Sequence, residues 1–181
     1  MPSAQPPRYC PQRELPPYSY VTGLFPHPTS DARGHSFGRK EPPPQPLDET
    51  NYRANATYRY AIDLFNHGFY WEAHEEWEAL WHVAGRHGAI ADFLKGLIKL
   101  AAAGVKVREG RAAGVRQHAE RAAELFRSVQ ANGGGEAMFG LPLTNLIAAA
   151  AATANRADEL VGDSKPDGNR RLPVELLLAK Y

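Results

Sequence analysis

From residue 51 onward, apolar side chains recur every three or four positions, which is the spacing of helices that bury one face. The pattern predicts five helices, over residues 51–66, 70–84, 89–108, 111–130 and 142–161. Glycines follow most of these segments, as expected where a left-handed residue ends a helix. No segment alternates β-branched and polar residues as a strand would. We therefore expect an all-α body, a compact bundle of about five antiparallel helices with short connections.

The first 50 residues have a different composition, because 12 of the 15 prolines lie at or before Pro46. Proline fixes φ and removes a backbone donor, so neither a helix nor a central strand is expected there. We divide the chain into a proline-rich N-terminal arm (1–50), a helical domain (51–161) and a C-terminal tail with a short element (162–181). The middle of the arm, 18–38, holds four aromatic residues and is expected to pack on the body. Residues 1–12, with an unpacked Cys10, are expected to be mobile.

Charge and cysteine content exclude several classes of protein. Lysine and arginine number 21 against 20 acidic residues, which argues against a nucleic-acid partner bound through its phosphates. One cysteine excludes an intramolecular disulfide framework and indicates a reducing compartment.

The start of the chain has no apolar run typical of a signal peptide, and no segment is long enough for a membrane span. These features predict a soluble, cytoplasmic protein without a membrane partner, and they leave its oligomeric state open.

The second predicted helix concentrates the candidate chemistry. On a helical wheel all three tryptophans share one face with His74 and Glu78, while Glu72 and Glu76 point the opposite way. Burying an imidazole or a carboxylate costs several kcal/mol unless it is partnered. Two interpretations follow: a buried polar network that fixes how the helices pair, or a pocket whose floor is His74, Glu75 and Glu78. The tryptophans Trp71, Trp77 and Trp81 would then be its aromatic wall.

A divalent metal ion is the cofactor that this pattern could accommodate. His74 and Glu78 are four positions apart, so both side chains can meet one ion on the same helix face. The segment reads HExxE rather than HExxH, and it therefore lacks the second helical histidine of a metalloprotease. Further ligands would have to come from elsewhere. His27 and His35, in the proline-containing loop of the arm, are the candidates.

Two lysines complete the set of candidate binding residues. Lys95 and Lys99 lie on the third predicted helix, opposite its apolar stripe. They could form a solvated face, or they could turn toward the carboxylates of the second helix or toward an anionic ligand. The candidate binding residues are therefore His74, Glu78, Trp71, Trp77, Trp81, Lys95 and Lys99.

Two sequence blocks carry a resemblance to a known family. They are DLFNHGFYWEAHEEWEALW at 63–81 and FLKGLIKLAAAGVKVREG at 93–110. Together they resemble the helical family catalogued as domain of unknown function number 309, over roughly residues 55–130. The resemblance implies an all-α fold of antiparallel helices and no established activity.

Two functional hypotheses remain. The first is a small-ligand or protein-interaction module with a polar site on the second helix, favoured because the chain has no GxSxG nucleophile motif and no phosphate-binding glycine loop. The second is a metal-assisted hydrolase in which Glu75 is the general base and His74 and Glu78 hold the metal or polarise the substrate. The sequence names neither the ligand nor the partner.

Overall fold

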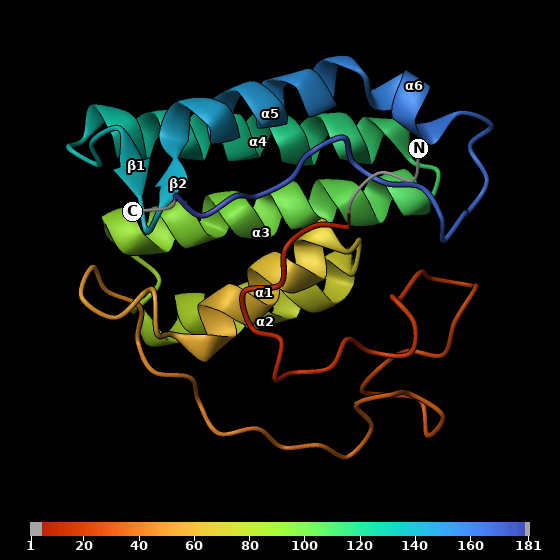
Figure 1. The fold of residues 1–181 in the computed structure, drawn as a ribbon. Helices are drawn as coiled ribbons and strands as arrows, with labels where there is room; N and C mark the ends of the chain where they lie inside the picture. Colours follow the sequence, from red (N-terminus) through yellow and green to blue (C-terminus); the bar gives the residue numbers. More distant parts are fainter. Residues whose placement is uncertain (1–4, 180–181) are drawn as a thin grey trace.

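The computed structural model describes residues 5–179. It contains six helices in this range: α1 (Ala56–Asn66), α2 (Tyr70–Val83), α3 (Ala89–Arg108), α4 (Ala112–Ala131), α5 (Leu143–Asn155) and α6 (Ala157–Val161). Each of α1 to α5 packs mainly against its neighbours in the chain. In Figure 1, α1 and α2 form the lowest layer, α3 lies in the middle, and α4 and α5 form the top. The predicted all-α fold class is confirmed. Within the described range, none of the helices has the length and apolarity that crossing a bilayer requires.

Three features of the secondary structure differ from the prediction by more than one residue. The first helix begins at Ala56 rather than near residue 51, because Asn55 caps it by accepting a hydrogen bond from the Tyr58 amide at 3.0 Å. The last predicted helix is interrupted at Arg156, whose backbone is not helical, so it forms α5 and the short α6. An antiparallel hairpin, β1 (Ala137–Met138) and β2 (Leu141–Pro142), precedes α5. Strands of two residues are too short to show an alternating pattern.

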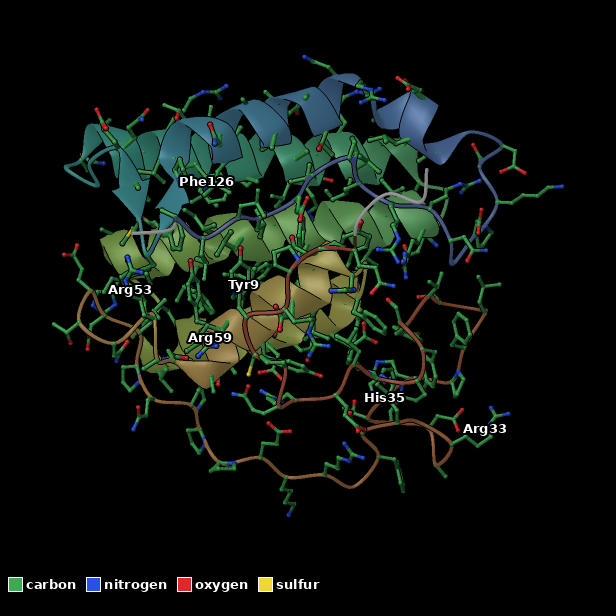
Figure 2. The ribbon with its side chains drawn as sticks, viewed as in Figure 1. Tyr9, Arg33, His35, Arg53, Arg59 and Phe126 are labelled. Atoms are coloured by element: carbon green, nitrogen blue, oxygen red, sulfur yellow. The ribbon has the colours of Figure 1, made fainter. Side chains whose placement is uncertain are left out.

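Two glycines explain how closely α3 approaches the helices on either side. A Cβ atom at Gly96 would lie 2.4 Å from the Phe126 ring of α4, and one at Gly104 would lie 2.5 Å from the Tyr70 ring of α2. Both aromatic side chains are buried, and Figure 2 places Phe126 in the upper part of the bundle. The absence of a side chain at these two positions therefore lets α3 serve as the central helix of the body.

The arm runs along the lower side of α1 and α2 (Figure 1). Its apolar side chains Cys10, Val21 and Leu47 are at most 2% exposed. The expectation that Cys10 is unpacked is therefore wrong. Residues 8–10 were expected to be mobile, but the Arg8 side chain and the Tyr9 and Cys10 amides bind a carboxylate of α1, as described below. Residues 1–4 lie outside the described residues.

The C-terminal tail crosses the body as an extended segment. Residues 162–179 form neither a helix nor a strand, so the short element expected there is absent from this described part. Leu172 and Leu176 are buried, and the Leu176 main chain exchanges two hydrogen bonds with the Asn66 side chain, at 2.7 and 2.8 Å. The tail thus covers the end of α1 instead of adding another helix.

Candidate functional site

The three clustered donors of α2 come together as the sequence predicted. A donor atom from each of His74, Glu75 and Glu78 lies within 4.8 Å of the other two. His74 Nδ1 lies 3.3 Å from Glu75 Oε1. Even so, His74 Nδ1 is buried and has no hydrogen-bond partner among the described residues. The cluster therefore holds a ligand nitrogen that the fold around it does not satisfy.

Glu75 and Glu78 differ from each other in exposure. The Glu75 side chain is 45% exposed, whereas Glu78 is half-buried. Within residues 5–179, Glu78 takes part in no hydrogen bond or ion pair, and His74 Nδ1 has no hydrogen bond, so no polar network of the described residues joins the two side chains. The two carboxylates are therefore held near each other without a neutralising cation.

Two lysines of α3, predicted as binding residues, form no ion pair with this cluster within residues 5–179. The Lys95 ammonium lies 5.5 Å from the centroid of the Trp81 ring, a cation–π contact, and Lys99 lies near His118 of α4. Partial burial lowers the pKa of His118 below its usual value, and the charges of Lys99 and Lys106 lower it further. His118 belongs to the neighbourhood of His74 but was not among the predicted residues. A lone histidine on an alanine- and arginine-rich helix gives no sign of what it faces.

The two arm histidines do not join the cluster. The His27 ring packs edge-on against Trp71, with the centroids 5.3 Å apart, and His35 Nε2 lies 3.2 Å from Glu72 Oε1. In Figure 2, His35 lies where the arm passes beneath the helices. The predicted four-residue metal set is therefore wrong, because the arm lies against the Glu72 side of α2 rather than the Glu78 side.

The tryptophans also separate. Trp77 is completely buried in the core, Trp71 lies beneath the arm, and Trp81 is half-buried under Lys95. The single aromatic wall predicted from the helical wheel is not formed. The wheel gives angles around one helix, but it does not say which of its faces are covered by other parts of the chain.

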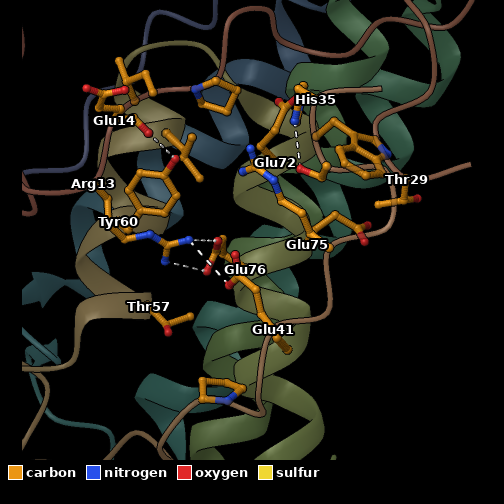
Figure 3. Close-up of a pocket in the computed structure, with 18 of the residues that line it drawn as sticks. Arg13, Glu14, Thr29, His35, Glu41, Thr57, Tyr60, Glu72, Glu75 and Glu76 are labelled. Carbon is orange, nitrogen blue, oxygen red and sulfur yellow. Dashed lines mark hydrogen bonds and ion pairs between the residues drawn. The ribbon is translucent and has the colours of Figure 1, made fainter. Parts of the chain in front are cut away.

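The side of α2 that was expected to face away from the site is covered by the arm. Glu72 is only 6% exposed and accepts hydrogen bonds from the Tyr20 amide at 2.8 Å and the Ser19 hydroxyl at 3.3 Å, in addition to its contact with His35. Glu76 binds both terminal nitrogens of Arg13, at 2.8 and 3.3 Å, as Figure 3 shows. Glu72 and Glu76 thus fasten the arm to α2.

Arg13 connects α2 to α1. Its guanidinium group lies 3.8 Å from the centroid of the Tyr60 ring, while the Tyr60 hydroxyl donates to the Glu14 carbonyl oxygen at 2.7 Å. Burial raises the pKa of Tyr60 to about 12, against the opposing effect of Arg13. The arginine is therefore held by a carboxylate at its edge and by an aromatic ring at its face.

Asp63 of α1 is a structural centre that the sequence interpretation missed. It is completely buried and accepts hydrogen bonds from Arg8 Nε, the Tyr9 amide and the Cys10 amide, at 2.9, 2.7 and 2.8 Å. A signal was present, since an aspartate among the apolar positions of α1 needs a partner. The sequence could not say that this partner is the arm, more than 50 residues away.

Comparison with known proteins identifies a family over part of the chain and leaves the activity open. Residues 58–117, which include α2 and α3, match the family model described as Domain of unknown function (DUF309). The resemblance drawn from the two sequence blocks is therefore confirmed over this segment. No curated protein matches the chain.

Proposed function

We propose that this protein is a ligand-binding helical module, and that its ligand on α2 is a divalent transition-metal ion held by His74, Glu75 and Glu78. The observation that carries the proposal is the convergence of one imidazole and two carboxylates within 4.8 Å, with His74 Nδ1 left unbonded. A mixed nitrogen and oxygen donor set suits zinc, manganese or iron. A buried polar atom without a partner costs free energy, which a bound ion would recover.

The geometry needs only small adjustments to hold an ion. Ligand atoms around a metal at about 2.0–2.2 Å are about 3–3.5 Å apart, so rotation of the glutamate side chains is sufficient to close the cluster. All three residues lie on one helix, at positions i, i+1 and i+4. Because α2 packs against both α1 and α3, its backbone is fixed before any ion binds.

Calorimetric titration of the full chain, stripped with a chelator, tests this proposal. We expect one equivalent of Zn²⁺ or Mn²⁺ to bind at neutral pH, and the affinity to weaken as the pH falls, because the ligands must be deprotonated. His74→Asn and Glu78→Gln should each weaken binding by at least about tenfold. Glu49→Gln, an exposed carboxylate of the arm, is the matched control. Absence of binding, or equal binding by all of these variants, would contradict the proposal.

A metal-assisted hydrolase is the second candidate, because two protein ligands, His74 and Glu78, would leave coordination positions for water and substrate. In this version Glu75, the most exposed member of the cluster, is the general base rather than a ligand. The variant Glu75→Gln separates the two roles. Weaker metal binding identifies Glu75 as a ligand, whereas intact metal binding with loss of metal-dependent ester or phosphoester hydrolysis identifies it as the base.

A further inference from the structure

A cavity separate from the metal cluster lies between α1, α2 and the arm. Its volume is about 540 Å³, within the range of about 300–1,000 Å³ that is usual for small-molecule sites. One wall comes from α1 and α2, and the other comes from two separate passes of the arm, around residues 13–17 and 35–44. Figure 3 shows Tyr60, Glu76 and Glu72 on the helix side, with Arg13, His35 and Glu41 on the arm side. The site exists only because the arm is folded onto the body.

Negative charge predominates in the walls of this cavity. Five glutamates line it, against two arginines. One of these, Arg13, is already occupied by Glu76 and by the Tyr60 ring. Glu41 reaches Arg13 only at 3.7 Å, and its side chain is 67% exposed. The other arginine, Arg39, is exposed and leaves the balance negative.

The environment of Glu76 also indicates that the cavity favours an additional positive charge. Burial raises the pKa of Glu76 above its usual value, even though Arg13 forms two charge-assisted hydrogen bonds with it and acts in the opposite direction. The single arginine therefore does not compensate fully for the burial of this carboxylate. A further positive charge beside it would be stabilised.

The remaining lining is apolar and aromatic. Trp71, Leu15, Leu64 and the prolines at 16–17 and 42–44 contribute carbon surface to the cavity. Arg13 shows how this cavity accommodates a cation, since a carboxylate binds the edge of the guanidinium group and the Tyr60 ring covers its face. A ligand with a charged head and a short apolar body would find both kinds of contact here.

We propose that this cavity binds a small organic cation, one that carries a guanidinium or primary ammonium group on a short apolar chain. Glu41 and the neighbouring carboxylates contact the charged group, and Trp71 and the prolines contact the apolar part. The site is separate from the metal cluster, although Glu75 borders both. Glu41 belongs to the cavity alone, and Glu78 belongs to the metal cluster alone.

Titration of the full chain with n-butylguanidinium, and with neutral n-butylurea of the same shape, tests the proposal. The protein is kept free of metal, and binding is followed by calorimetry and by tryptophan fluorescence. We expect n-butylguanidinium to bind in the micromolar to millimolar range and n-butylurea to bind at least about tenfold more weakly. Glu41→Gln should raise the dissociation constant by about threefold or more, while Glu49→Gln and Glu78→Gln should leave it unchanged.

The other results overturn the proposal. Equal binding of the two probes would show that the cavity does not select a cation. An equal effect of Glu49→Gln would indicate attraction by the surface charge as a whole, and no binding of either probe at about 10 mM would show that the cavity is not a site for this ligand class. Because Glu78→Gln removes the metal cluster alone, the two proposals can fail independently.

Discussion

The two sides of α2 both carry glutamates, but the fold treats them differently. Glu72 and Glu76 lie beneath the arm, where an amide, a hydroxyl, a histidine and an arginine bind them. Within residues 5–179, Glu75 and Glu78 form no hydrogen bond with the arm, although Glu75 borders the cavity beneath it, and they lie beside a histidine whose Nδ1 has no hydrogen bond. Four similar residues in one helix thus divide into two that hold the structure together and two that remain available.

This division suggests where to look for function in the molecule. A carboxylate that accepts two or three hydrogen bonds from a distant segment is part of the scaffold, because its loss leaves those donors unsatisfied. A carboxylate that no distant segment binds contributes little to the scaffold and remains available to a ligand. Substitutions of Glu72 or Glu76 should therefore lower the stability of the fold, whereas substitutions of Glu75 or Glu78 should mainly affect ligand binding.

The largest effect is expected on the arm side, from Asp63→Ala. The substitution removes the acceptor of Arg8 Nε and of the Tyr9 and Cys10 amides, and it should lower the free energy of unfolding by about 3–5 kcal/mol. Chemical denaturation measures the change. Asp158→Ala, which breaks the exposed ion pair with Arg116, is the control and should be close to wild type. If Asp63→Ala lowers the free energy of unfolding as little as Asp158→Ala does, the arm contributes little to stability.

Glu72→Ala should have the next largest effect, about 1–3 kcal/mol, because the Tyr20 amide loses its acceptor and His35 loses its contact with the carboxylate. The Ser19 hydroxyl keeps the Gly68 carbonyl oxygen as an acceptor. The arm should loosen locally, and Trp71, which contacts Tyr20 and His27, should become more accessible to a fluorescence quencher. Glu75→Ala, one turn along the same helix, is the matched comparison. The distinction between the two sides of α2 fails if both variants behave alike.

In metal-free protein, Glu78→Gln should change stability by less than about 0.5 kcal/mol, since within residues 5–179 this carboxylate has no hydrogen bond or ion pair to lose. Its effect should appear only when metal is added. Wild-type protein should then show a rise in melting temperature that the variant lacks. A variant that is strongly destabilised without metal would support the buried polar network instead.

The smallest effect concerns His118, whose pKa lies below its usual value through burial and through the nearby charges of Lys99 and Lys106, with Glu109 opposing. Since this pKa is lowered by folding, neutral His118 contributes stability above about pH 6.5, the pKa of an ordinary histidine, and the contribution is lost as the pH falls through the lower folded pKa. Lys99→Met should raise the pKa of His118. Titration of its ring proton by NMR measures this shift, and an unchanged pKa would place Lys99 away from His118.

Part of the candidate site could be predicted from the sequence because it depends only on local geometry. His74, Glu75 and Glu78 lie within a single helix, so a helical period is sufficient to bring them together. The separation of Trp71 from Trp77 and the binding of His35 to Glu72 could not be obtained in this way. They depend on which segment covers each face, and the arm pairs with α2 across 37 to 63 residues.

The sequence by itself determined the helical class and the central helices closely, because apolar periodicity and glycine positions act over a few residues. Only the tertiary structure decided the course of the arm, the burial of Cys10 and Asp63, and the cavity beside Tyr60. Proline-rich segments form no internal hydrogen bonds, so their sequence does not predict one conformation. Their path is set by the buried donors and acceptors that they must satisfy elsewhere, and those partners become neighbours only when the whole chain is folded.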